Sequence, residues 1–343
     1  MKRFISSLLL VLVAALQVQT ADAQDEQPDV LDHPRDKRAQ TGMQFLSVSM
    51  SPRAAAMADA MVASVDVGSM AMFYNPAAMA TLEGGDLNVG TFEWIADINY
   101  NGASIGFTPS GGRYGTFAVT AVSVDYGDIE GTIRSSNEQG YERIGTFSPT
   151  ALALGFGYAR SFSDRFSVGG GVRYVHQDLG SSVMDSDRTT QENSVSTPVF
   201  DFGVLYRTGF RSLNLGMAAR NFSPTVTYEE EAFETPLLLT AGASMDMLDV
   251  FAPTMSANHG LLINAEAGHP RSYDEQVRIG GEYQFMNILF LRAGYAFPND
   301  EQGLNLGAGV NVDVSGLSFG ADYAYSQFGD LGDVNRIGLH VGF

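Results

Sequence analysis

The stretch "LNLGAGVNVDVSGLSFGADYAYS" (residues 304–326) decides the fold, because its apolar and polar residues alternate with a period of two. From Leu304 to Val314, Leu, Ala or Val stands at every even position, and Asn, Gly or Asp stands at every odd position. Ser315 and Gly316 form a turn signal, and the alternation then resumes. A period of two is typical of β-strands with one apolar face and one polar or small face. The stretch therefore predicts a β-hairpin with two unlike faces.

Similar segments recur along the chain and predict about fourteen strands of roughly ten residues, the length with which tilted strands cross a bilayer. Short turns alternate with longer acidic loops near 125–147, 179–195 and 223–234, as in outer-membrane barrels. One connection, residues 246–257, is long where a short turn is expected. The pattern predicts an all-β, transmembrane antiparallel β-barrel over 86–343, with strands at 86–94, 99–108, 113–124, 148–160, 165–178, 196–208, 211–222, 235–245, 258–268, 275–285, 288–297, 303–314, 317–328 and 334–343.

A soluble β-sandwich would also alternate, but its core would hide large residues and not charges. Here charged residues fall on the polar faces of the strands, together with many glycines. These residues are predicted to line a wet lumen in which the arginines pair with the two acids. The predicted lumen charges are Arg173, Asp201, Arg207, Arg220, Arg292, Asp322 and Arg336. Aromatic residues gather near strand ends, which is typical of an interfacial girdle.

The two ends of the chain carry export signals. Lys2 and Arg3 precede an apolar run at 4–16, and Ala-Asp-Ala at 21–23 provides a cleavage site, which predicts a signal peptide over 1–23. Residues 24–40 are polar and predict a flexible leader. The last strand resembles the terminal signal by which the barrel-assembly machinery recognises barrels for insertion into the cell outer membrane; the residues concerned are Ile337, Leu339, Val341 and Phe343.

The formal net charge is −19, and lysine occurs only at Lys2 and Lys37. Nucleic acid is excluded as a partner, because binding it requires clustered positive charge. The acidic, lysine-poor composition is consistent with a high-salt habitat or simply with an acidic surface. There are no cysteines, so disulfides and thiolate chemistry are excluded.

Residues 41–85 differ from both the leader and the barrel, since they are rich in Ala and Met and nearly uncharged. Within "FYNPAAMATL" (73–82), Asn75 is placed to cap a helix and Pro76 to occupy its first position. A barrel of fourteen strands is too wide to be filled by its own side chains, so its lumen either conducts water or is closed. We expect 41–85 to be a plug seated in the lumen, the alternative being an ordinary periplasmic leader.

The stretch "MSPRAAAMADAMVASVDVGSMAMFYNPAAMATL" (50–82) resembles the N-terminal signature of the PorV/PorQ family of outer-membrane barrels. That family is similar in turn to FadL-type transporters of hydrophobic compounds, which share the Asn-Pro-Ala motif and a fourteen-stranded barrel. Ala78 departs from the pattern, because the relatives more often have glycine there. The residues that match the signature are Arg53, Ala54, Ala55, Met57, Ala58, Asp66, Asn75, Pro76 and Ala77.

The resemblance implies a role in the type IX secretion system. PorV-type barrels sit beside the secretion translocon, capture secreted proteins by their C-terminal sorting domains and pass them to the attachment machinery. PorQ-type relatives act with that attachment complex. The alternative is a FadL-like passive transporter of hydrophobic compounds, which needs an apolar pocket near the outer mouth and a lateral opening. Inward-facing arginines argue weakly against such an apolar path.

The sequence predicts no enzyme, no cofactor and no metal site. Gly102–Gly106 matches the G-x-S-x-G pattern of serine hydrolases, but it lies inside an alternating strand and not at a strand–turn–helix junction. The five histidines are scattered and lack the spacing of metal ligands.

Overall fold

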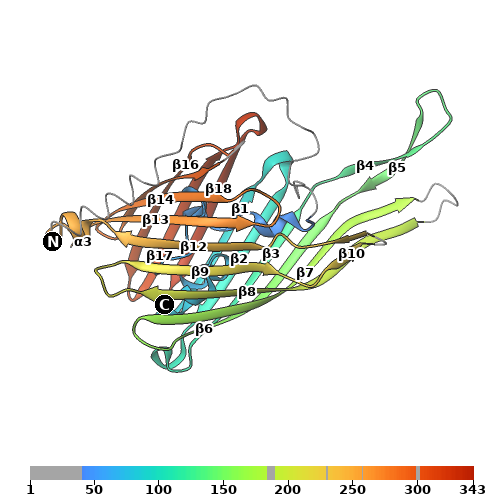
Figure 1. The fold of residues 1–343 in the computed structure, drawn as a ribbon. Helices are drawn as coiled ribbons and strands as arrows, with labels where there is room; N and C mark the ends of the chain where they lie inside the picture. Colours follow the sequence, from blue (N-terminus) through green and yellow to red (C-terminus); the bar gives the residue numbers. More distant parts are fainter. Residues whose placement is uncertain (1–40, 184–189, 229–230, 257, 299–301) are drawn as a thin grey trace, which may run out of the picture. The chain divides into compact units, whose positions relative to one another are not determined.

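The computed structural model describes residues 41–183, 190–228, 231–256, 258–298 and 302–343. The predicted signal peptide and leader lie outside these residues. Fourteen strands form a closed barrel in which β1 pairs with β18 and all neighbouring strands are antiparallel (Figure 1). This confirms the predicted fold class. The barrel strands are β1 (Gly85–Glu93), β2 (Asn99–Phe107), β3 (Thr116–Asp125), β6 (Thr150–Ser161), β7 (Phe166–Val183), β8 (Thr190–Arg207), β9 (Asn214–Phe222), β12 (Leu238–Asp246), β13 (His259–Pro270), β14 (Gln276–Phe285), β15 (Leu289–Phe297), β16 (Asn305–Val314), β17 (Leu317–Gln327) and β18 (Asp333–Gly342).

The two ends of the barrel differ. At the end where β1 begins, called the turn end here, the two-residue turn Ser315-Gly316 has positive φ at both positions. This backbone matches the twist of a β-hairpin, which is why two residues suffice. The exceptional connection after β12 lies at the same end and contains the short helix α3 (Leu248–Phe251). Short turns face the periplasm in outer-membrane barrels.

The opposite end, called the loop end, contains more strand than the sequence predicted. The predicted loop 125–147 contains the hairpin β4 (Ile129–Arg134) and β5 (Tyr141–Phe147), and the loop 223–234 contains β10 (Val226–Tyr228) and β11 (Glu231–Phe233). The prediction of a loop over 179–195 was also wrong in part, because β7 and β8 continue into this range (Figure 1). These strands are short or rich in charged and polar residues, so their alternation is weak in the sequence.

The outer face of the barrel carries the apolar residues of the period-two pattern. Val310, near the middle of β16, is 45% exposed, and Leu306, Val312 and Leu339 are exposed on the same surface. Within the described residues no helix has the length and apolar character needed to cross a bilayer. The exposed apolar residues of the outer face are the ones placed to meet lipid.

Replacing Val310 with Arg is expected to destabilise the barrel by about 2–4 kcal/mol, because a charge near the bilayer midplane is poorly solvated. Asn311 lies on the inner face, where it accepts a hydrogen bond from Ser318 at 2.8 Å, so Asn311→Arg is expected to be tolerated. Urea unfolding of the two variants in lipid vesicles measures the difference. Equal losses in both variants would contradict the face assignment.

Residues 41–84, called the lumen segment here, lie against the inner face of the barrel (Figure 1). At the loop end Gly42 donates its backbone N–H to the Glu234 carbonyl at 3.0 Å, and at the turn end the segment joins β1. The segment therefore enters the lumen at the loop end and leaves it at the turn end, and between these points it returns from the turn end at 65–68 to the loop-end side at Phe73 and Tyr74. It contains the short helices η1 (Gln44–Ser47), α2 (Pro52–Ala56), η2 (Gly68–Phe73) and η3 (Pro76–Thr81).

The predicted helix start at Asn75 and Pro76 is present, although η3 is a 3₁₀-helix of only six residues. Asn75 Oδ1 accepts from the Ala77 N–H at 3.1 Å, which is the expected cap. Asn75 Nδ2 also donates to the Val62 carbonyl at 2.6 Å and to the Val204 carbonyl at 3.0 Å. Asn75 thus joins two parts of the lumen segment to strand β8.

The core of the molecule lies between the lumen segment and the barrel wall. Met43, Phe45 and Met50 pack with wall residues such as Val175 and Val199, and a second cluster joins Met72 and Met79 to Leu205. The expectation of a wet lumen is wrong for these layers. The lumen segment brings apolar surface of its own, so the wall residues that meet it are apolar as well.

Wall glycines allow this close packing. A Cβ at Gly216 would lie 2.0 Å from the Val62 carbonyl oxygen, and one at Gly294 would lie 2.3 Å from the Met57 carbonyl carbon. Because both neighbours are backbone atoms, no side-chain rotation could relieve the clash. At Gly216 and Gly294 the absence of a side chain therefore allows two backbones to make contact, whereas at Gly157 and Gly203 it makes room for side chains of the lumen segment.

Candidate functional site in the barrel lumen

An arginine of the lumen segment binds the barrel wall near the turn end. Helix α2 is capped by Ser51 and begins at Pro52, so Arg53 lies in its first turn and its side chain extends from there. Arg53 Nε donates to Glu282 Oε2 at 2.9 Å and Arg53 Nη2 donates to Glu282 Oε1 at 2.8 Å. Arg53 Nη1 also donates to the Asp66 carbonyl at 3.1 Å. Arg53 therefore holds both the wall and another turn of its own segment.

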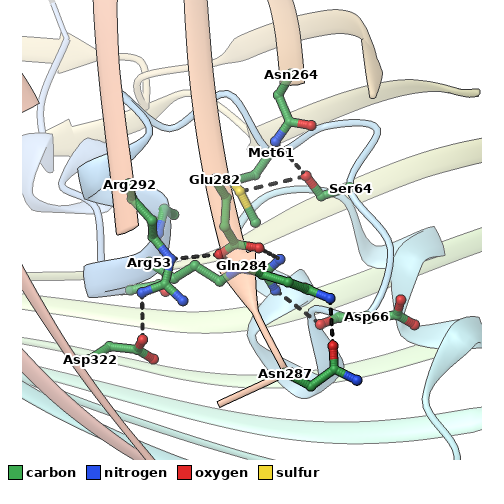
Figure 2. A network of polar contacts seen from close by, with 12 residues as sticks. Arg53, Met61, Ser64, Asp66, Asn264, Glu282, Gln284, Asn287, Arg292 and Asp322 are labelled. Carbon is green, nitrogen blue, oxygen red and sulfur yellow. Dashed lines mark hydrogen bonds and ion pairs between the residues drawn. The ribbon is translucent and has the colours of Figure 1, made fainter. Parts of the chain in front are cut away.

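The same carboxylate binds a second arginine from the neighbouring strand. Glu282 and Arg292 are directly opposite in the β14–β15 ladder, and Arg292 Nε donates to Glu282 Oε2 at 2.6 Å. Arg292 Nη1 donates to Asp322 Oδ1 on β17 at 2.5 Å, and His340 Nδ1 lies 3.5 Å from Asp322 Oδ2. Figure 2 shows Arg53, Glu282, Arg292 and Asp322 in one continuous set of contacts. These four residues are called the Arg53 network below.

The Arg53 network is electrically balanced and largely buried. It contains two guanidinium groups and two carboxylates, and the side chains of Glu282 and Arg292 are only 4% and 3% exposed. Charged hydrogen bonds of this kind are short and directional. A buried pair tolerates the loss of one partner poorly, because the remaining charge is left without compensation. The network therefore ties the lumen segment to three strands of the wall.

A second acidic residue of the wall binds the backbone of the lumen segment. Glu266 Oε2, on β13, accepts from the N–H groups of Met61 at 3.1 Å and Val62 at 2.9 Å. On the same strand, Asn264 donates to Ser64 Oγ at 2.9 Å. Sequence reasoning missed Glu266 and Glu282. Both fall on the polar face of their strands, which is the same signal that selected the arginines.

Of the predicted lumen charges, the structure brings Arg173 to Asp201 and Arg292 to Asp322. Arg173 makes two hydrogen bonds of 2.8 Å to the Asp201 carboxylate. Asn221, which has a φ of 61°, donates its N–H to Asp201 at 2.8 Å, beside a register shift between β8 and β9 at Phe200 and Phe202. This cluster fills the irregular part of the wall.

The other three predicted arginines do not pair with Asp201 or Asp322. Arg207 lies exposed at the turn end. Arg220 donates through Nη1 to the carbonyl oxygen of Phe73, in the lumen segment. Arg336 donates to Ser326 Oγ at 3.0 Å, and its guanidinium carbon lies 4.8 Å from the ring centre of Phe92.

The predicted assembly residues lie along the β18–β1 seam or on the lipid face. Ile337 and Leu339 point outward and are exposed, whereas Val341 is half-buried. Phe343 and Gly85 exchange two backbone hydrogen bonds, of 2.7 and 2.8 Å. The role of these residues as an assembly signal stays a prediction.

Two cavities lie on opposite sides of the lumen segment. The turn-end vestibule, of about 720 Å³, is lined by acids that include Asp66, Asp86 and Glu282. The loop-end chamber, of about 180 Å³, has a cationic lining with one acid, Asp59. Its arginines are Arg173, Arg220, Arg271 and Arg278.

The G-x-S-x-G pattern lies in the middle of β2. Ser104 is buried, and its hydroxyl lies 2.7 Å from the Ser69 hydroxyl of the lumen segment. Among the described residues there is no group of three or more His, Asp or Glu side chains that could hold a metal ion.

Comparison with known families gives one match. Residues 140–340 match the model of the family described as type IX secretion system membrane protein PorP/SprF. This range covers β5 to β18 and so most of the barrel. None of the curated proteins has a sequence that matches the chain.

Several solved structures are similar in fold. A FadL homologue from Pseudomonas aeruginosa is 14% identical, with a TM-score of 0.54 over 86% of this chain and 98% of that one. The toluene transporter TbuX of Ralstonia pickettii is 13% identical, with a TM-score of 0.53 over 85% of this chain and 96% of that one. The toluene transporter TodX of Pseudomonas putida is 13% identical, with a TM-score of 0.54 over the same shares. At these identities the likeness concerns the fold alone.

Proposed function

Because the chain belongs to the PorP/SprF family of type IX secretion system membrane proteins, we propose that it is a closed outer-membrane barrel that binds proteins during secretion. Its work is done by the rim and the projecting hairpins of the loop end. The lumen segment closes the pore and keeps the membrane tight. This role needs no catalytic group, and Ser104 is a packing residue in it.

The observation that carries the proposal is the way in which the lumen segment is held. Its charged residue Arg53 is bound to two wall strands through Glu282, and its backbone approaches wall glycines too closely for any side chain. The register shift between β8 and β9, where a lateral opening would be easiest, is occupied by Arg173 and Asp201. A passive pore would need a path through one of these places.

The specific role is that of a shuttle, which captures secreted proteins by their C-terminal sorting domains and passes them on from the secretion translocon. The resemblance of residues 50–82 to PorV/PorQ barrels supports this role. The loop end provides the surface, since the β4–β5 hairpin carries exposed Ile129, Tyr141 and Ile144. Acidic residues on the same hairpin would exclude wrong partners and steer correct ones.

Replacing residues 128–148 with a short Gly-Ser linker is expected to abolish co-purification of secreted proteins that carry C-terminal sorting domains. The barrel ladder does not include β4 and β5, so the variant should fold. The measurement is affinity purification from native outer membranes in mild detergent, followed by mass spectrometry. The matched control shortens the α3 connection (248–256) at the turn end and should leave capture unchanged. Unchanged capture after the hairpin deletion would contradict the proposal.

The second candidate is a FadL-like passive transporter of hydrophobic compounds. The similarity in fold to two toluene transporters favours it. In the same purification, fatty acid or hydrocarbon bound to the intact chain, with no secreted protein, would support this candidate instead.

A further inference from the structure

Among the described residues, one arginine that lines the loop-end chamber has no carboxylate within ion-pair distance. Three of the four arginines that line it have carboxylate partners: Arg173 has Asp201 at 2.8 Å, Arg271 has Glu234 at 3.3 Å, and Arg278 has Glu266 at 3.7 Å. Arg220 makes no such ion pair in the described part of the chain, and the carboxylates of Glu266 and Asp59 act on it only at longer range. Among the described residues that line the chamber, Asp59 is the one acid, and it accepts a hydrogen bond from the Ser49 hydroxyl.

The position of Arg220 keeps its charge inside the chamber. The residue lies on β9 and donates through Nη1 to the Phe73 carbonyl, and its guanidinium carbon lies 5.7 Å from the Tyr74 ring centre. Its Nε is buried and has no hydrogen-bond partner in the described part of the chain. A guanidinium that is partly withdrawn from water and lacks a carboxylate binds an oxyanion favourably.

The rest of the lining selects the kind of oxyanion. The chamber has a volume of about 180 Å³, which is enough for a small group. Beside the arginines it is lined by apolar side chains such as Phe45, Val48 and Leu237. It lies under the loop-end connections, with exposed Tyr273 in its lining, so a ligand would arrive from that side. Mixed apolar and cationic walls suit a carboxylate joined to a small apolar group.

We propose that the loop-end chamber binds a carboxylate-bearing ligand, with the carboxylate on Arg220 and the adjoining apolar group against the lumen segment. Arg278, whose ion pair to Glu266 is long, supports the same negative charge. The planar guanidinium of Arg220 matches the two oxygens of a carboxylate. The carboxylate can belong to the end of a polypeptide or to a small organic acid. This proposal does not depend on the proposed role in secretion, so the binding experiment tests it separately.

The test uses the full chain in lipid nanodiscs and isothermal titration calorimetry. The probes are N-acetyl-alanyl-leucine with a free carboxylate, the same peptide with a C-terminal amide, and hexanoate. The intact chain is expected to bind the free peptide acid at least about tenfold more tightly than the amide, because a charge-assisted hydrogen bond is lost in the amide. Arg220→Gln is expected to remove this preference. The control Arg113→Gln, at an exposed position of the turn end, is expected to keep it.

Arg220 also contacts the lumen segment, so a second variant separates binding from support of Phe73. Arg278 is linked to the lumen segment only through Glu266, and Arg278→Lys keeps a positive charge beside that carboxylate while it removes the planar guanidinium. Arg278→Lys is therefore expected to weaken binding of the peptide acid while ion conductance stays at the level of the intact chain. Hexanoate binding without peptide binding would support the site and assign it to small organic acids. Equal affinity for acid and amide, or an acid preference that survives Arg220→Gln, would overturn the proposal, as would failure of all three probes to bind.

Discussion

Deleting residues 45–80 is expected to leave a folded barrel that conducts ions in planar lipid bilayers, whereas the intact chain conducts little. The ladder of fourteen strands closes through β1 and β18 without any residue of the lumen segment. A closed ladder satisfies its own backbone hydrogen bonds and does not need the segment to remain in the membrane. Recording single channels from purified protein measures the difference between the two chains.

The deletion also uncovers wall residues that the segment buries. Val175, Val199 and Leu205 would meet water, and Glu282 and Arg292 would lose Arg53. We therefore expect a lower unfolding temperature together with the open channels, while heat-modifiable migration on gels shows that the barrel still folds. Large and steady conductance from the intact chain would contradict the assignment of the lumen segment as a plug.

The second large effect is expected for Glu282→Gln. Removing one partner of a buried ion pair costs about 3–5 kcal/mol, because the remaining charge is not compensated. Here one substitution affects both Arg53 and Arg292. The Arg53 side chain is 21% exposed toward the vestibule, so water recovers part of the loss and we expect the lower end of this range. Urea unfolding in lipid vesicles measures the change in the free energy of unfolding.

Two controls separate the loss of the network from a general effect of charge. Asp313→Asn removes an exposed carboxylate near the turn end and is expected to change stability by less than about 0.5 kcal/mol. The double variant Arg53→Met, Glu282→Gln is expected to be more stable than the sum of the two single variants predicts, because neither partner is then left with an unpaired charge. Strict additivity would show that the two groups do not interact.

The strands of this protein could be predicted from local sequence. Each strand faces lipid on one side and the lumen on the other, so apolar and polar residues alternate along it. This alternation is enough to predict hairpins such as 304–326. The turn at Ser315 and Gly316 and the cap at Asn75 are also local, because each depends on residues two or three positions apart. The hairpin β4–β5 was missed, since its strands are short and charged or polar residues separate their apolar ones.

The arrangement of the lumen was decided by the tertiary structure. The polar face of each strand marks a residue as inward, but it does not say what that residue meets. Arg53 and Glu282 are more than two hundred positions apart in the sequence, and nothing local distinguishes Glu282 from other polar-face acids. Arg220 and Arg336 were expected beside Asp201 or Asp322 and instead meet a carbonyl and a hydroxyl. The path of the lumen segment determines which inward-facing side chains are buried, which form ion pairs and which line a cavity. The reason is that this path sets which groups of the segment come within hydrogen-bonding distance of the barrel wall.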